Sequence, residues 1–426
     1  SYVARAELSS IYLPRTRAFP DNTEVEAVVT LVGRPEGDYL KTVAPDPTHL
    51  SVHVHHSLVR LPDDGYRPLP YEPRAGYMDP AYGDRFFADY ATPIADSLRR
   101  HWLPRHRLQK RDPGAALSDP VEPIVYYLDP GAPEPMRSAL LEGAGWWNQA
   151  FEAAGYRNAF RVEMLPEGAD PMDVRYNVIQ WVHRATRGWS YGASVRDPRT
   201  GEIIKGHVTL GSLRVRQDLL LAEGLLAPYG ERDRSAEVEE FALARLRQLS
   251  AHEVGHTIGL EHNFAASVND SASVMDYPHP LLRLDASGEV DISGAYAEGI
   301  GEWDKRAILY GYQDFPAGVD EAAARAGILA ETLVSGLYFV ADADARDVGS
   351  AQPLGGLWDD GANAVDELAR LVAGRRGAAL LPVRTGGGGR FGTRAFLRLP
   401  AGQGGSARLR PRLGQRLSPQ RSRVLP

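Results

Sequence analysis

The chain has 426 residues, 43% of them hydrophobic and 24% charged, and a formal net charge of −7. This is the composition of a globular protein, and the length allows two or three domains with cores of their own. There is no cysteine, which excludes disulfides, thiolate metal ligands and a cysteine nucleophile. No apolar run approaches the roughly 18 residues of a transmembrane helix, so we expect no membrane span.

Charge is distributed unevenly along the chain. Residues 375–426 hold 12 arginines and no lysine or acidic residue. The rest of the chain therefore contains 36 of the 48 basic residues and all 55 acidic residues. The remaining body, with a net charge of −19, argues against a nucleic-acid partner. The tail itself is rich in Gly, Arg and Pro without a periodic pattern and is predicted to be disordered.

Shifts in composition divide the chain into four regions. Residues 1–115 alternate between apolar and polar types among Pro, Gly and Asp, which predicts a β-rich N-terminal domain. Residues 109–120 are polar with two prolines and are interpreted as a linker. A second domain is expected at 121–315, a partial helical region at 316–374, and the tail at 375–426.

The second domain alternates strands with helices. Residues 197–201, Asp-Pro-Arg-Thr-Gly, are typical of the turn of a hairpin. Ser235 is a good N-cap, and the acidic residues after it suit the start of a long helix. The order predicts an α+β fold in which a twisted mixed sheet carries packed helices. The expected elements are strands at 123–128, 160–165 and 176–183, a hairpin over 191–210, and helices at 135–154, 235–258, 321–333 and 363–372.

The decisive segment is His252–His262, with the sequence HEVGHTIGLEH. On a helix, His252 and His256 are four residues apart and lie on one face, so both imidazoles can bind one ion. Gly259 can adopt the left-handed conformation that ends a helix, which brings His262 back to the metal. Three protein ligands and an open position are the pattern of one catalytic zinc.

Glu253 follows the first histidine and is not needed to hold the metal. It is expected to be the catalytic base, taking a proton from a zinc-activated water and returning it to the leaving amine. The alternative for the whole segment is a set of ordinary histidines on a helix.

At this point the sequence resembles the metzincins, whose signature is His-Glu-x-x-His-x-x-Gly-x-x-His/Asp. Ser273–Tyr277 resembles the Met-turn of that clan, with Met275 beneath the zinc-binding histidines and Tyr277 as a stabiliser of the oxyanion. On sequence alone, Met275 could equally fill the core and Tyr277 could be a packed aromatic. Trp303–Gly311 resembles the helix that closes such catalytic domains. The resemblance also implies a substrate-binding edge strand, formed by Gly192, Ala193, Ser194 and Val195.

Over about residues 1–315, the chain is most similar to a bacterial family of zinc-dependent metalloproteases with a Met-zincin domain. That resemblance makes 121–315 the metzincin catalytic domain and implies an endopeptidase that acts on a peptide or protein. It also implies export to the periplasm, outer surface or medium, with the signal segment absent from this chain. Two alternatives stay open: a latent or inactive zinc-binding protein, and a zinc amidase acting on cell-wall peptide.

The remaining observations concern regulation and further metals. Metzincins are commonly held latent by an upstream segment, so the N-terminal region is a candidate regulator, with Asp84 as one possible zinc ligand. His53 and His55 share a strand face and could bind a second metal, although a structural role is the simpler interpretation. The same applies to His207 near the edge strand. Some metzincins bind calcium, but no spacing of oxygen ligands indicates a calcium site here.

Overall fold

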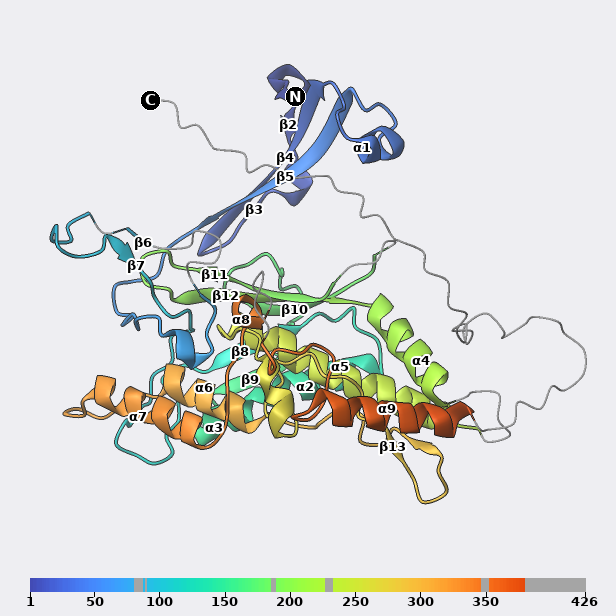
Figure 1. The fold of residues 1–426 in the computed structure, drawn as a ribbon. Helices are drawn as coiled ribbons and strands as arrows, with labels where there is room; N and C mark the ends of the chain where they lie inside the picture. The colour runs from blue at the N-terminus through green and yellow to red at the C-terminus, as the bar shows by residue number, and fades with distance from the viewer. Residues whose placement is uncertain (80–86, 89, 185–188, 227–232, 346–351, 380–426) are drawn as a thin grey trace, which may run out of the picture. The chain divides into compact units, whose positions relative to one another are not determined.

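The computed structural model has an α+β fold that consists of an N-terminal antiparallel sheet and a mixed sheet with packed helices (Figure 1). This confirms the fold class expected from the sequence. The helices among the described residues are not long and apolar enough to cross a membrane. The residues described are 1–79, 87–88, 90–184, 189–226, 233–345 and 352–379.

The N-terminal sheet is built on one long strand, β4, with which four other strands pair antiparallel. Its buried face carries carboxylates where apolar residues are usual: Glu24 and Glu26 are both buried. His55 Nε2 lies 2.5 Å from Glu24 Oε2, and His53 Nδ1 lies 2.6 Å from Glu26 Oε1. These histidines therefore pair with buried acids. The elements are β1 (Tyr2–Ala4), β2 (Ser10–Ile11), β3 (Arg17–Ala18), β4 (Asn22–Gly33), α1 (Asp38–Val43) and β5 (His49–Val59), with short 3-10 helices at Ala6–Leu8 and Leu13–Arg15.

The mixed sheet has the strand order β11-β12-β10-β8-β9. Four strands run parallel, and β11 alone is antiparallel, at the edge beside β12. The predicted strands and hairpin are all present. They are β8 (Ile124–Leu128), β9 (Phe160–Met164), β10 (Asn177–Val182), β11 (Tyr191–Arg196) and β12 (Ile203–Gly211).

From β8 to α5, the helices differ from expectation in three places. The single helix expected at 135–154 is two, α2 (Met136–Gly145) and α3 (Trp147–Ala153), which meet at Trp146. Helix α4 (Leu213–Leu226) was not predicted, because its apolar residues lack a clear helical period. Ser235 is the first residue of α5 (Ser235–Thr257) and not its N-cap, since Arg234 precedes it without a capping side chain.

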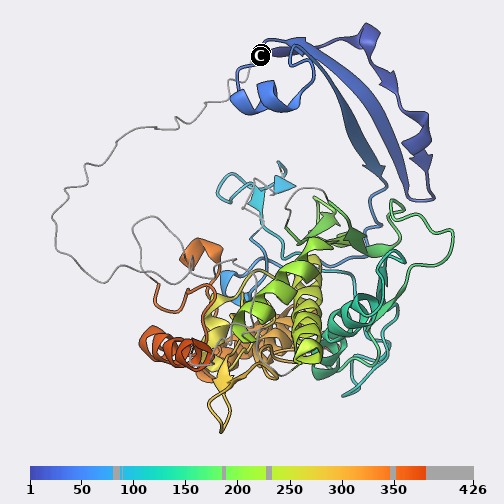
Figure 2. The ribbon, with the colours of Figure 1, turned by 90° about the vertical axis from the view of Figure 1, so that its right-hand side faces the viewer.

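Helix α5 is the central element of the structure, packed between α2 and the strands β11 and β12 (Figures 1 and 2). All ten residues from Gln248 to Thr257 are buried. Small residues permit this close packing, because a Cβ on Gly143 of α2 would lie 2.0 Å from the Arg247 carbonyl oxygen. Ser250 Oγ donates to the carbonyl oxygen of Leu140 at 2.8 Å, which fixes the two helices together.

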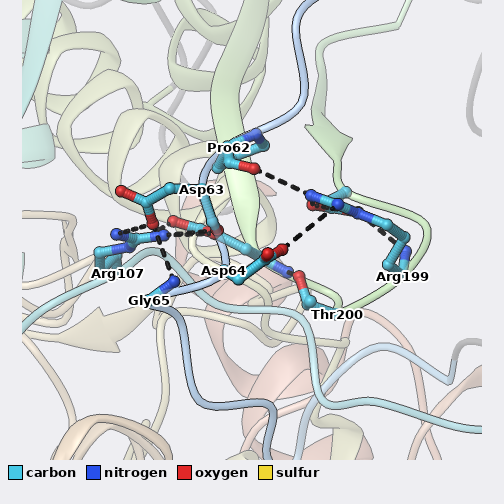
Figure 3. Close-up of polar contacts among 9 residues, drawn as sticks. Pro62, Asp63, Asp64, Gly65, Arg107, Arg199 and Thr200 are labelled. Atoms are coloured by element: carbon cyan, nitrogen blue, oxygen red, sulfur yellow. Dashed lines mark hydrogen bonds and ion pairs between the residues drawn. The ribbon is translucent and has the colours of Figure 1, made fainter.

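The segment between the two sheets is tied to the mixed sheet by arginines (Figure 3). Arg199, in the β11–β12 turn, donates to the Pro62 carbonyl oxygen at 2.9 Å, and Arg107 donates both to Asp63, at 2.8 Å, and to Glu202, next to β12, at 2.7 Å. Further on, Tyr77 and Leu103 are fully buried in the same core as the mixed sheet. The segment expected as a linker, 109–120, is also packed: Lys110 is buried and its backbone N–H donates to Asp314.

The C-terminal part supplies four helices and returns to the region of α5. Trp303 of α6 stacks on Phe339, with ring centroids 5.4 Å apart. Residues 338–340 bond to Asn263 and Phe264, just after the histidine segment. These helices are α6 (Glu302–Tyr312), α7 (Glu321–Val334), α8 (Asp342–Ala345) and α9 (Ala364–Ala379). The remaining elements, earlier in the chain, are the small hairpins β6–β7 (Phe87–Ala88, Arg99–Arg100) and β13–β14 (Arg283–Leu284, Val290–Asp291) and 3-10 helices at Pro73–Ala75 and Phe264–Asn269. The disordered tail expected at 375–426 is wrong for its first five residues, because α9 continues to Ala379, and the rest lies outside the described residues from 380 onward.

Candidate metal centre

Helix α5 brings His252, Glu253 and His256 into the core together. The space beneath them is filled by Met275, whose side chain is completely buried. A Cβ on Gly255 would lie 2.2 Å from Met275 Sδ, so only glycine at this position lets the methionine pack against the helix between the two histidines. The sequence places a small residue and a flexible thioether where this packing needs them.

Gly259 turns the chain after the helix. Its φ of +108° lies where side chains are strained, and a Cβ there would lie 2.0 Å from the Pro104 carbonyl oxygen. Helix α5 ends two residues earlier, and the turn carries His262 back beside His256, with ring centroids 4.6 Å apart. The structure thus brings together the three predicted ligands, whose ring nitrogens lie within 4.8 Å of one another.

The hydrogen bonds of the three rings determine which nitrogen is free. His252 Nδ1 lies 2.8 Å from the Val274 carbonyl oxygen, and His256 Nδ1 lies 2.9 Å from that of Leu260. A carbonyl oxygen only accepts, so both Nδ1 atoms carry the proton. His262 Nδ1 contacts the carboxylate of Asp342 in the same way. In His252 and His256 this leaves Nε2 available to bind a metal, and the contact with Asp342 leaves the Nε2 of His262 facing that of His256.

These free nitrogens fit zinc. His256 Nε2 and His262 Nε2 are 3.1 Å apart. Tetrahedral zinc with Zn–N bonds of about 2.0–2.1 Å separates its ligand nitrogens by about 3.3 Å. The donor set, its spacing and its outer hydrogen bonds are those of a zinc site.

Burial controls the charge of the site. It holds the pKa of His252 well below its usual range and, together with His262, lowers the pKa of His256 to about 3. Both rings are therefore neutral, as metal ligands must be. Burial also raises the pKa of Glu253 to about 8, against the pull of Arg245. A carboxyl group of raised pKa beside potential metal ligands is suited to exchanging protons near neutral pH.

A cavity of about 460 Å³ opens beside the histidines. Glu253 and Tyr277 line it, and so does Trp358, which stacks on Tyr277 with ring centroids 5.3 Å apart. The Tyr277 ring also lies against His252 and His262, at centroid distances of 5.3 and 4.7 Å. The predicted oxyanion stabiliser is thus placed in contact with two ligand rings.

The edge strand β11 runs directly over the helix. Ala193 and Ser194 pair with His207 and Gly206 of β12, which leaves the other side of β11 without a strand partner among the described residues. A Cβ on Gly192 would lie 2.1 Å from the Glu253 carbonyl oxygen, so glycine is what allows this approach. The backbone N–H of Gly192 also bonds to Glu253 and lowers its pKa. The predicted substrate strand therefore lies within hydrogen-bonding distance of the predicted base.

Comparison with known families agrees with this geometry. Residues 234–380 match the Met-zincin family, and residues 1–111 match a domain of unknown function (DUF5117). The chain carries a metzincin-type Met-zincin domain. Such a domain implies zinc binding and a function of the metallopeptidase type. No curated protein matches the chain.

The Met-zincin match begins one residue before α5 and continues through α9. It therefore includes two residues that sequence analysis missed, Asp342 and Trp358, both placed beyond the expected end of the domain at 315. Neither belongs to a local motif, and each reaches the site only because the C-terminal part folds back. A third missed residue, Asp304, is fully buried; it accepts hydrogen bonds from Ser273 Oγ at 2.6 Å and from the Val274 N–H at 2.8 Å. It fixes the turn that carries Met275.

The other predicted or possible ligands are placed elsewhere. His207 is on β12, where burial lowers its pKa, and it belongs to none of the possible metal groups found among the described residues. His279 lies near Asp360 and Glu367, a set that could hold an ion by distance. Arg370 donates to both of these acids and already compensates their charge. Asp84, the proposed latency ligand, lies outside the described residues.

Proposed function

We propose that this protein is a zinc-dependent endopeptidase. The observation that carries the proposal is the convergence of the ring nitrogens of His252, His256 and His262 beside Glu253, which lines a cavity near the edge strand β11. The Met-zincin match supports the class of activity.

Each residue has a distinct role in the proposed mechanism. His252, His256 and His262 would hold zinc, which supplies a Lewis acid for the substrate carbonyl and lowers the pKa of a bound water to about 7. Glu253 takes the proton of the attacking water and returns it to the leaving amine. Met275 supports the histidines from beneath, and Tyr277 donates to the oxygen on which negative charge develops.

The proposed substrate is an extended chain. Backbone groups on the free side of β11 can pair with a peptide by strand addition, which holds a straightened substrate along Gly192–Val195. Strand pairing recognises any backbone and suits an endopeptidase. An amidase acting on cell-wall peptide could use the same base, and the two differ only in which substrates are cleaved. Export of the protein stays a prediction.

The test compares wild type with Glu253→Ala and Glu253→Gln, using a library of quenched fluorescent peptides and elemental analysis of zinc. Glu239→Gln, an exposed position on the same helix, is the matched control. We expect about one zinc in all four proteins, and cleavage only in wild type and the control, with a loss of at least about 100-fold in the two base variants. Zinc without cleavage in wild type would favour the zinc-binding alternative.

A further inference from the structure

The cavity beside the proposed catalytic residues carries an excess of positive charge. Its lining includes Arg184, Arg214 and Arg245, against the single acid Glu253. Apolar residues complete the walls, among them Leu249 of α5. A cavity lined by guanidinium groups is suited to binding a carboxylate.

Arg245 is the unusual member of this set. It is only 3% exposed, and its Nε has no hydrogen-bond partner in the described structure. Its contacts are a hydrogen bond from Nη1 to Gln248 and a position over the Tyr296 ring, 5.6 Å from the centroid. Neither partner carries a negative charge. A buried guanidinium without a bonded carboxylate is costly unless a ligand supplies one.

One buried acid, Asp218, interacts electrostatically with both Arg214 and Arg245. Asp218, fully buried on α4, accepts a hydrogen bond from Arg214 Nε at Oδ2, 3.2 Å away, while its Oδ1 has no hydrogen-bond partner in the described structure. The two arginines repel, as the lowered pKa of Arg245 reflects after the larger effect of its burial. One carboxylate thus serves two neighbouring guanidinium groups and bonds to only one of them.

Arg245 is aligned with the reacting atoms. Arg245, Leu249 and Glu253 are spaced by four residues on α5 and share one face of the helix, which forms a wall of the cavity. Glu253 lies at one end of this wall and Arg245 two turns away, roughly 12 Å along the helix axis. A substrate whose scissile carbonyl lies at Glu253 can extend a neighbouring side chain along this wall.

We infer that this cavity is a specificity pocket that accepts an acidic side chain, Asp or Glu, from the substrate residue beside the scissile bond, with Arg245 as its principal determinant. The inference rests on the proposed peptidase function and deepens it. It specifies the charge of one substrate side chain, a property that backbone pairing along β11 cannot select.

The experiment uses twin peptides that differ only in Asp versus Asn, or Glu versus Gln, at each position flanking the cleaved bond. We expect wild type to favour the acid twin by about 10-fold or more in kcat/KM at one position, as a charge-assisted hydrogen bond implies. Arg245→Met should reduce the ratio to about 1, and Arg245→Lys should retain part of it. Arg214 is less buried than Arg245, so Arg214→Gln tests the same pocket if the Arg245 variants do not fold. Arg216→Gln, exposed on the same helix, should keep the wild-type ratio.

A binding arm separates this inference from the proposed function. Labelled acid and amide twins are titrated into zinc-loaded Glu253→Gln by fluorescence anisotropy. Cleavage without any acid preference overturns the inference and leaves the peptidase standing. If Glu253→Gln binds the acid twin more tightly and wild type cleaves neither peptide, the inference is supported and the proposed peptidase function is overturned. Equal binding of both twins, with no cleavage, overturns both.

Discussion

The carboxylate of Asp342 accepts a hydrogen bond from Nδ1 of His262, eighty residues earlier in the chain. The first two histidines bond to backbone carbonyls near the helix, whereas the third depends on this side chain from α8. The orientation of the third ligand is therefore controlled by the C-terminal part of the Met-zincin domain.

Replacing Asp342 should weaken the metal site without unfolding the protein. Asp342→Ala removes the acceptor that fixes the His262 tautomer, and we expect zinc affinity to fall by about 10- to 100-fold. Zinc affinity is measured by competition with a chelator of known affinity. Asp344→Ala, exposed on the same short helix, is the control. An unchanged affinity in Asp342→Ala would show that Asp342 does not position the ligand.

Gly192→Ala should displace β11 from the active-site helix. Its Cβ would meet the Glu253 carbonyl oxygen at 2.1 Å and the His256 Cβ at 3.0 Å. We expect a loss of about 1–3 kcal/mol in the free energy of unfolding and a larger relative loss of cleavage. The matched control is Gly211→Ala on β12, where a Cβ would meet nothing within 4 Å. Denaturant titration and peptide cleavage of both variants check this, and equal behaviour of the two would contradict the packing.

The boundary of the folded catalytic unit should lie before residue 77, not at 121. Tyr77 is fully buried and its hydroxyl donates to the Ala307 carbonyl oxygen at 3.0 Å. We expect a fragment of residues 61–379 to unfold cooperatively and a fragment of 121–379 to fail to fold. In the full chain, Tyr77→Ala should cost about 3–5 kcal/mol and Tyr77→Phe about 1 kcal/mol. Circular dichroism with denaturant measures each, and a stable 121–379 fragment would refute the assignment.

Stability should decrease as pH rises toward 8. Burial raises the pKa of Asp276 to about 8 and, against the opposing effect of Arg370, that of Asp360 to about 7, whereas both unfolded values are near 3.8. The folded protein therefore binds more protons than the unfolded chain between these values. The stabilisation of the folded protein by these protonated carboxyl groups is complete at low pH. It is lost as pH rises through the folded pKa, by up to about 1.4 kcal/mol per pH unit for each group.

Asp276→Asn isolates this effect from that of the buried histidines, which act in the opposite direction below about pH 6.5. We expect the unfolding free energy of the variant to fall less steeply between about pH 6.5 and 8 than that of wild type. Urea titrations at several pH values supply the comparison. Parallel pH profiles for the two proteins would mean that Asp276 is ionised in the folded state throughout.

The sequence by itself determined the local parts of this protein. The spacing of His252, Glu253 and His256 predicts a shared helix face because helical geometry is local, and the turn residues of 197–201 predict the β11–β12 hairpin for the same reason. The α+β class follows from the order of elements. Gly259 could also be assigned to the turn after the helix, because glycine readily adopts the left-handed conformation that brings the third histidine back.

Only the tertiary structure decided what surrounds these parts. Asp342, Trp358 and Asp304 reach the site through folding back of the C-terminal segment, and no periodic pattern encodes a contact between residues this far apart. The same holds for Tyr77 in the catalytic core and for Arg245, whose side chain could as well have faced solvent. A helix repeat specifies which residues share a face, but burial, partners and charge balance depend on which other elements pack against that face.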